Sequence, residues 1–247
     1  MHPTPHIWST STESKRLVAR HAEGFVLAVI LTVAALIAPG INASAGADPC
    51  PDVEVVFARG TFEPAGVGAT GQAFVDALRG RLAGSSIDVY AVNYPASLDF
   101  SRAADGVTDA STKILQLASS CPQTKIVLGG YSQGAAVAAY TTTDTVPVGF
   151  TLPTGITGPM PATVANHVAA VALFGKPSGS FVNMVDRDAP PITIGHLYAS
   201  KTIDLCVPDD PVCSPAGTDQ NAHNAYPVNG MTDQAADFAA RAVTGST

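Results

Sequence analysis

The sequence has few basic residues, and it nowhere gathers them into a patch. Its 13 Lys and Arg are outnumbered by 20 Asp and Glu, so the formal net charge is −7. Proteins that bind nucleic acid through its backbone need a basic patch or stripe to neutralise the phosphates. An acidic chain without such a patch is expected to have no nucleic-acid partner.

Long hydrophobic runs are also rare. The one notable run covers 25–38, follows Lys15, Arg16 and Arg20, and precedes small residues that offer cleavage sites at 43–45 or 45–47. It is short for a membrane span, and this order is that of a secretory signal peptide. We therefore predict a leader over 1–47 and a secreted protein, extracellular or associated with the cell wall. An uncleaved anchor is the alternative.

Cysteine is scarce and lacks metal-binding spacing. No Cys-x-x-Cys or His-x-x-x-His pattern accompanies Cys50, Cys121, Cys206 and Cys213, so no metal is expected. Four cysteines in an exported chain indicate two disulfides, for which three connectivities are possible. The short stretch between Cys206 and Cys213, rich in Pro and Asp, favours a local pair there and a distant pair of the other two.

The remaining residues, 48–247, contain no Pro- or Ser-rich linker, no repeat and no block of like charges. About 200 residues usually form one domain with a full hydrophobic core. We expect a single domain and a monomer.

Apolar segments of strand length alternate with amphipathic segments of helix length. This alternation predicts an α/β fold with a parallel sheet covered by helices on both faces. Ligands of such sheets bind beyond the carboxyl ends of the strands. Strands are expected at 53–58, 87–93, 125–130, 168–174 and 202–205, and helices at 72–82, 103–118, 133–143 and 233–243.

A Gly-x-Ser-x-Gly motif, residues 130–134, lies between an expected strand and an expected helix. Two glycines around Ser132 allow the sharp turn of a nucleophile elbow, in which the serine hydroxyl stands clear of the sheet. A bare motif of this kind is weak, but strand before and helix after strengthen it. An acid and a histidine also follow in the order Ser…Asp…His, which is typical of hydrolases with this turn.

Three histidines lie outside the leader. His167 directly precedes an expected strand and should lie at the wrong end of the sheet, whereas His196 falls in a stretch that could end near either face. His223 lies in the long loop after the last strand, where the base of such enzymes is found. We predict His223 as the base.

Equal spacing links the first and third strands. Thr61 lies 11 residues after Cys50, and Ser132 lies 11 residues after Cys121. If these cysteines are bonded, Thr61 and Ser132 should meet at the carboxyl end of the sheet. Thr61 and Gln133 are then candidates for the oxyanion hole, through their backbone amides.

Three spaced motifs resemble the cutinase family of serine esterases, especially the secreted cutinase-like proteins of mycobacteria. They are the segment 50–61, the motif 130–134, and Cys206-x-x-x-Asp210-x-x-Cys213 followed by His223. The resemblance implies Ser132, Asp210 and His223 as the catalytic triad, Thr61 and Gln133 at the oxyanion, and disulfides 50–121 and 206–213. It also implies a three-layer sandwich around a five-stranded, mostly parallel sheet, without a large lid.

The expected activity is hydrolysis of short- to medium-chain acyl esters through an acyl-enzyme, with no cofactor and with an ester or lipid as substrate. A transient contact with a lipid or cell-wall surface is also expected. The alternatives are an acyltransferase or phospholipase with the same triad and a non-catalytic binding protein. Leu98, Phe100, Phe181, Val182 and Met184 are candidates for an acyl groove, or they are ordinary packing under loops.

Two further segments carry weaker patterns. Gly66-Val-Gly-Ala-Thr-Gly71 fits a dinucleotide fingerprint, but it begins too far beyond the strand for that role. The apolar segment 146–161 follows the helix that leads away from Ser132. We expect it at the amino end of the sheet, away from the chemistry, as a surface loop or partner site.

Overall fold

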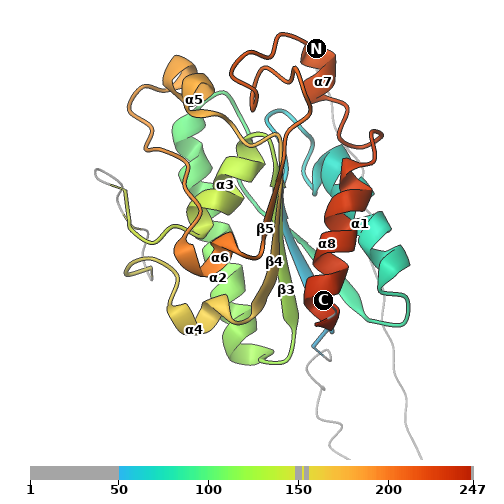
Figure 1. Ribbon diagram of the computed structural model, residues 1–247. Helices are drawn as coiled ribbons and strands as arrows, with labels where there is room; N and C mark the ends of the chain where they lie inside the picture. Colours follow the sequence, from blue (N-terminus) through green and yellow to red (C-terminus); the bar gives the residue numbers. More distant parts are fainter. Residues whose placement is uncertain (1–49, 148–151, 153–155, 246–247) are drawn as a thin grey trace, which may run out of the picture. The chain divides into compact units, whose positions relative to one another are not determined.

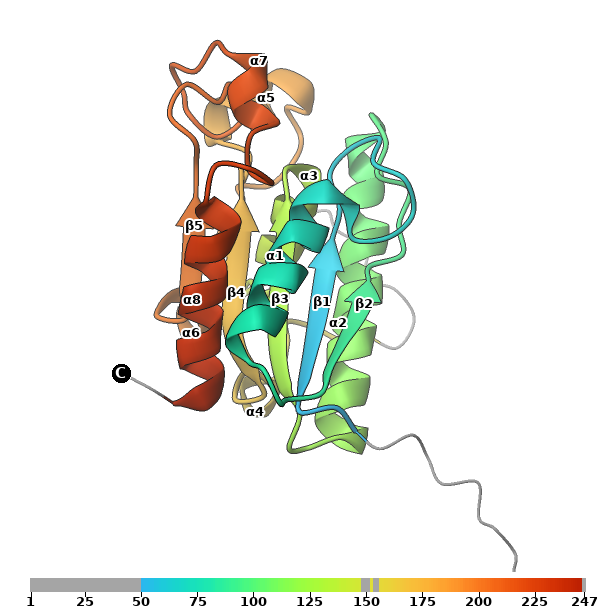
Figure 2. The ribbon, with the colours of Figure 1, turned by 90° about the vertical axis from the view of Figure 1, so that its right-hand side faces the viewer.

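The computed structural model describes residues 50–147, 152 and 156–245, so the predicted leader lies outside the described residues. A five-stranded sheet in the order β2-β1-β3-β4-β5, parallel throughout, forms its centre (Figures 1 and 2). This confirms the predicted α/β class. The strands are β1 (Val53–Ala58), β2 (Ile87–Ala91), β3 (Lys125–Tyr131), β4 (Val168–Phe174) and β5 (Thr202–Leu205).

Helices cover both faces of the sheet. In Figure 1, α1 and α8 lie on one face, and α2 and α3 lie on the other. Successive side chains of β1 point to opposite faces of the sheet. Val55 and Phe57 pack toward α1 and α8. Val56 and Ala58 pack toward α2 and α3. The bounds are α1 (Gly68–Arg81), α2 (Ala103–Ser120), α3 (Gln133–Thr141) and α8 (Met231–Thr244).

Five short helical segments were not predicted, since a single turn carries no readable periodicity. They are η1 (Phe100–Arg102), α4 (Ala162–Ala165), α5 (Gly179–Val185), α6 (His196–Ala199) and α7 (Gln220–His223). In the described part of the chain, no helix has both the length and the apolar character needed to cross a bilayer.

From β1 the sheet extends to β2 on one side and to β3, β4 and β5 on the other. The direction in which the chain adds strands therefore reverses at β1. Such a switch point leaves a crevice at the carboxyl ends of the two central strands, where α/β sheets bind ligands. The disulfide Cys50–Cys121 joins the segments that enter β1 and β3, with the Cα atoms 5.6 Å apart. Val53 pairs with Lys125 and Ala58 with Gly130. If this register continued, Gly60 would lie opposite Ser132, so Thr61 lies one residue beyond that position.

Two glycines permit close contact between α3 and the central strands. A Cβ at Gly134 would lie 2.0 Å from the carbonyl oxygen of Ala58, and a Cβ at Gly130 would lie 2.1 Å from the carbonyl oxygen of Gly134. No side chain fits at either position. The glycines therefore let the helix that follows Ser132 lie against the ends of β1 and β3.

Gly134→Ala should destabilise the protein by about 3 kcal/mol, because the new methyl group would overlap backbone atoms of β1. Gly80→Ala in α1 is the matched control, since a Cβ at Gly80 meets nothing within 4 Å. That variant should be neutral or more stable by up to about 1 kcal/mol, since alanine favours helix. Urea unfolding of both variants measures the difference, and equal stabilities would contradict the packing argument.

Candidate active site

Ser132 occupies a strained turn between β3 and α3. Its backbone angles are φ 54° and ψ −119°, a region that non-glycine residues rarely adopt. The amide of Ser132 donates to the carbonyl of Phe174 at the end of β4, at 2.9 Å. The sharp turn expected from the motif is thus present, and it places the serine at the carboxyl edge of the sheet.

His223, at the end of α7, reaches Ser132 from the other side of the crevice. Its Nε2 lies 3.0 Å from Ser132 Oγ, and its side chain is almost fully buried. The ring stacks on Tyr131, with centroids 5.1 Å apart, and the Tyr131 hydroxyl donates to the carbonyl of His223 at 2.7 Å. The residue before the serine therefore orients the loop that carries the histidine.

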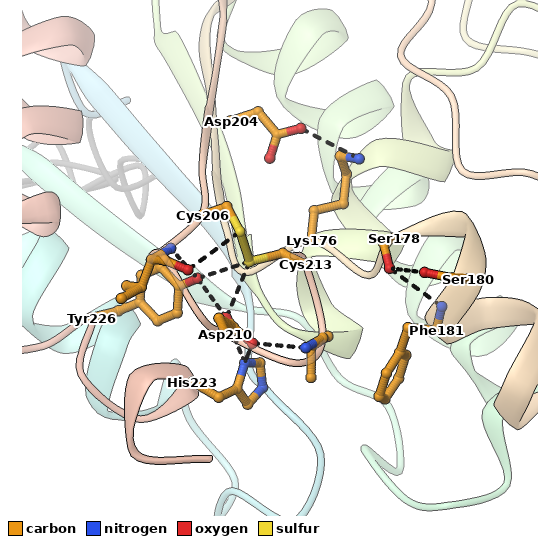
Figure 3. The surroundings of a disulfide bond; sticks show 12 residues. Lys176, Ser178, Ser180, Phe181, Asp204, Cys206, Asp210, Cys213, His223 and Tyr226 are labelled. Carbon is orange, nitrogen blue, oxygen red and sulfur yellow. Dashed lines mark hydrogen bonds and ion pairs between the residues drawn. A yellow bond between two sulfur atoms is a disulfide. The ribbon is translucent and has the colours of Figure 1, made fainter. Parts of the chain in front are cut away.

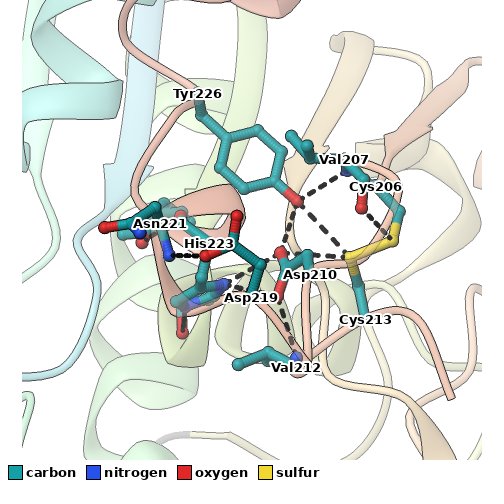
Figure 4. A network of polar contacts seen from close by, with 11 residues as sticks. Cys206, Val207, Asp210, Val212, Cys213, Asp219, Asn221, His223 and Tyr226 are labelled. Carbon is teal, nitrogen blue, oxygen red and sulfur yellow. Dashed lines mark hydrogen bonds and ion pairs between the residues drawn. A yellow bond between two sulfur atoms is a disulfide. The ribbon is translucent and has the colours of Figure 1, made fainter. Parts of the chain in front are cut away.

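Asp210 completes this chain of contacts and is fully buried. Both of its carboxylate oxygens lie 2.9 Å from His223 Nδ1. The amide of Val212 donates to Oδ1 at 2.8 Å, and the hydroxyl of Tyr226 donates to Oδ2 at 2.7 Å (Figure 4). Burial alone would raise the pKa of Asp210, but the hydrogen bonds from His223, Tyr226 and Val212 outweigh it and lower the pKa.

The second disulfide, Cys206–Cys213, closes the loop that carries the acid. Figure 3 shows this bond beside Asp210, and Cys213 Sγ lies 3.2 Å from Asp210 Oδ2. Both disulfides thus have the pairing that the sequence favours. The short loop limits the directions that Asp210 can take.

Neighbouring aspartates point elsewhere. Asp204 lies within β5, as predicted, and pairs with Lys176 at 3.3 Å (Figure 3). Asp209 is exposed, and its carboxylate accepts a hydrogen bond from the amide of Thr218 at 2.8 Å. Of the three aspartates near the last strand, only Asp210 faces His223.

The other two described histidines also have different surroundings. His196 is exposed, and its Nδ1 lies 2.7 Å from Asp144 Oδ1. His167 precedes β4 at the amino end of the sheet, where its carbonyl accepts from the amide of Ile126 at 2.8 Å. Neither residue lines the cavity around Ser132.

On the oxyanion side, Thr61 and Gln133 line the same cavity as Ser132. Gln133 is the first residue of α3, where backbone N–H groups have no partner inside the helix. The amide of Phe62 donates to the carbonyl of Ala96 at 2.7 Å, and Gln133 Nε2 donates to the carbonyl of Ser97 at 2.9 Å. Helix N-termini favour negative charge, so this edge can stabilise a developing oxyanion.

Sequence reasoning missed Glu63, which organises the loop after β1. Its carboxylate accepts from the amide of Gly60 at 2.6 Å and from the amide of Ala69 at 2.8 Å. The second contact places a carboxylate at the start of α1, the position that a phosphate would take in a dinucleotide site. No local pattern distinguishes Glu63 from an exposed loop glutamate.

Tyr226 was also missed, although it is fully buried beside Asp210. Its hydroxyl accepts from the amide of Val207 at 3.1 Å and donates to Asp210. The tyrosine therefore links the disulfide loop to the segment that follows His223. The available signal was its position three residues after the predicted base.

A cavity of about 620 Å³ surrounds Ser132 and His223. Four of the five apolar residues proposed for an acyl groove line it, namely Leu98, Phe100, Phe181 and Val182. The fifth, Met184, does not line this cavity and is 72% exposed. Among the residues that the structure describes, no three His, Cys, Asp or Glu side chains cluster as a metal site would require.

The expectation for segment 146–161 is corrected by its described residues; 148–151 and 153–155 lie outside the described part. Val146, Pro147 and Met160 line a second cavity together with residues of η1 and the first half of α2. That cavity shares residues with the one around Ser132. Described residues of the segment thus line the neighbouring cavity beside η1 and α2, and none of them lines the cavity around Ser132.

Tyr226→Phe should lower the free energy of unfolding by about 2 kcal/mol at neutral pH, because it removes a donor to a buried carboxylate. In the folded protein the hydrogen bonds to its carboxylate hold the pKa of Asp210 below the ordinary value of an aspartate. The stability deficit of Tyr226→Phe should therefore persist at pH values above that ordinary pKa and shrink as the pH falls through the pKa of the folded state.

Tyr198→Phe is the matched control for this measurement. Tyr198 is also buried, but its hydroxyl has no hydrogen-bond partner among the described residues. Removing that hydroxyl should cost little at any pH. Denaturant unfolding across the acid range tests both variants, and a deficit of Tyr226→Phe that does not depend on pH would contradict the assigned bond.

Known proteins similar to this chain were found at the level of family, sequence and structure. A family model described as Cutinase matches residues 49–243. The "Carboxylesterase Culp1" of Mycobacterium tuberculosis is 50% identical over 213 residues, which cover 86% of this chain and 91% of that protein. The "Phospholipase Culp4" of the same organism is 47% identical over 240 residues, covering 96% and 97% of the two chains.

Solved structures agree with these relatives. A Trichoderma reesei cutinase in complex with a C11Y4 phosphonate inhibitor has a TM-score of 0.58 and 31% identity, covering 79% of this chain and 78% of the other. An acetylxylan esterase has a TM-score of 0.61 and 25% identity, covering 76% of this chain and 97% of the other.

Proposed function

This chain belongs to the cutinase family of ester hydrolases, and we propose that it cleaves carboxylic esters through a Ser132–His223–Asp210 triad and an acyl-enzyme intermediate. The observation that carries the proposal is the unbroken set of contacts from Ser132 Oγ through both nitrogens of His223 to the buried Asp210. A binding protein without catalysis would have no use for a strained serine in hydrogen-bond contact with a histidine.

The reaction proceeds in two halves. His223 Nε2 takes the proton of Ser132 as Oγ bonds to the ester carbonyl carbon, and Asp210 holds the ring tautomer and stabilises the imidazolium. The backbone amides of Thr61 and Gln133 hold the oxyanion. The imidazolium then protonates the leaving alcohol as the ester bond breaks. A water molecule, deprotonated by His223, then attacks the acyl carbon. As the bond from that carbon to Ser132 Oγ breaks, His223 returns the proton to Oγ and the acid is released.

The substrate is a short- to medium-chain acyl ester or lipid. The apolar wall formed by Leu98, Phe100, Phe181 and Val182 favours an alkyl chain beside the nucleophile. Phe62 and Leu98, which line the cavity, are 73% and 63% exposed. Large exposed apolar side chains at the mouth of a site support a transient contact with a lipid or cell-wall surface.

We further propose that the protein is secreted as one domain, 48–247, after removal of its leader. The leader pattern lies outside the described residues, so the support comes from the sequence and from the disulfides. Two disulfides, one of them beside the acid of the triad, require an oxidising compartment to form and persist. The monomeric state is part of the same proposal.

Ser132→Ala should abolish hydrolysis of nitrophenyl butyrate and reaction with a fluorophosphonate label, while the melting temperature stays nearly unchanged. The reason is that the hydroxyl serves chemistry, whereas the Cβ and the backbone of the turn remain. Gel fluorescence of labelled wild type and variant, with thermal melts, provides the measurement. Retained turnover in the variant would refute the assignment of the nucleophile.

Asp210→Asn should lower kcat by about 10⁴-fold, because the amide no longer holds the correct tautomer of His223. Asp209→Asn is the matched control, since Asp209 is exposed and does not contact His223, and the amide oxygen of Asn can still accept from Thr218. It should cost less than about 10-fold, because only the field of the carboxylate is lost. Steady-state kinetics on the butyrate ester compares the two. The reverse ranking would move the acid to Asp209, and equally small effects would dismiss the triad.

A further inference from the structure

A second cavity of about 540 Å³ lies beside the one that contains Ser132. Its walls come from the first half of α2, the end of α3, the segment 186–190 and described residues of 146–160. It is of a size that proteins use for small molecules or for part of a larger one.

The two cavities share part of their lining. Phe100, Ala103, Tyr140, Asp186 and Ala189 line both. All five are only half-buried, so they are not locked into the core. The boundary between the cavities therefore consists of side chains from η1, α2, α3 and the 186–190 segment. One hydrogen bond lies at this boundary, in which the hydroxyl of Tyr140 donates to the carbonyl of Pro190.

One face of helix α3 extends from the first cavity to the second. Ser132, Ala136 and Tyr140 follow at intervals of four residues, so they lie on one face of the helix, and each lines the cavity around the nucleophile. Tyr140 also lines the second cavity. At 1.5 Å per residue, the distance along the helix from Ser132 to Tyr140 is about 12 Å. The small side chain of Ala136 leaves this face open.

The chemistry of the second cavity favours an apolar occupant. Ala104, Val107 and Met160 contribute apolar surface, and none of its described lining residues is Lys or Arg. Asp186 and Asp188 add only negative charge. A phosphate or carboxylate would meet no cation there and would be repelled. An alkyl chain needs neither charge nor hydrogen bond.

We propose that the second cavity is a subsite for the distal part of a long acyl chain whose ester carbonyl lies at Ser132. This extends the proposed function beyond short- and medium-chain esters and rests on its catalytic triad. Short acyl chains end in the first cavity, while longer chains pass along α3 beside Ala136 and Tyr140. Each methylene buried in the subsite should then raise kcat/KM by about fourfold until the cavity is filled.

Two threonines of α2 offer a matched pair of variants. Thr108 lines the second cavity and Thr112, one turn later, is exposed and lines neither cavity. Both hydroxyls donate to the carbonyl four residues earlier, at 2.9 Å from Thr108 and 2.8 Å from Thr112. Replacement of either threonine by Trp removes the same kind of side-chain hydrogen bond from the same helix. The two variants therefore differ in whether the indole enters the second cavity.

The experiment measures kcat/KM for nitrophenyl esters from butyrate to palmitate. Thr108→Trp should leave the butyrate value unchanged and lower the long-chain values by at least about tenfold, because several methylenes lose their site. Thr112→Trp should match the wild type at every length. Equal losses at all lengths, or no loss at any length, would overturn the subsite.

A second measurement needs no bulky side chain. The described residues contain no free cysteine, so Thr108→Cys and Thr112→Cys each introduce one reactive thiol. A long-chain alkylphosphonate attached to Ser132 should slow maleimide labelling at position 108 and not at 112, whereas a short-chain phosphonate should slow neither. Equal labelling at position 108 with both phosphonates would overturn the proposal. An inactive wild type that fails to react with either phosphonate would instead refute the proposed function.

Discussion

The arrangement of the site depends on one buried carboxylate. Asp210 is fully buried, and a carboxylate in such a place is stable only when it accepts enough hydrogen bonds. Its donors come from three places: the amide of Val212, the hydroxyl of Tyr226 and the ring of His223. The hydrogen bonds to the Asp210 carboxylate therefore hold together the disulfide loop, α7 and the segment after it. The same contacts fix the direction in which His223 presents Nε2 to Ser132.

The sheet supplies the other half of the site. Because β1 and β3 are neighbours at the point where strand order reverses, the loops that follow them open side by side. Gly130 and Gly134 let α3 begin directly against these strands. The nucleophile and the start of α3 are thus positioned by rigid elements, whereas the acid and the base lie on loops held by a disulfide and by buried hydrogen bonds.

Sequence reasoning succeeded for elements with a strong local pattern. The strands at 53–58, 168–174 and 202–205 have the predicted bounds, and the elbow at Ser132 has the predicted strained turn. It failed where a residue's role depends on contacts distant in sequence. Tyr226 and Glu63 resemble ordinary loop residues until the fold brings Asp210 and the loop after β1 beside them. The place of segment 146–161 was not predictable either, because its described residues pack beside η1 and α2, which no local pattern indicates.

By itself, the sequence determined the class of fold, the order Ser132, Asp210, His223 and the family, because strand periodicity, glycine spacing and motifs are local properties of the chain. The cysteine spacing also pointed to both disulfide pairs. The family motif selected Asp210 over Asp209, but only the tertiary structure decided how the two differ, since Asp210 is buried, faces His223 and is supported by Tyr226. Adjacent residues have the same local chemistry, so burial and partners must distinguish them. The second cavity beside α3 likewise arises only from packing, since its walls come from four separate parts of the chain.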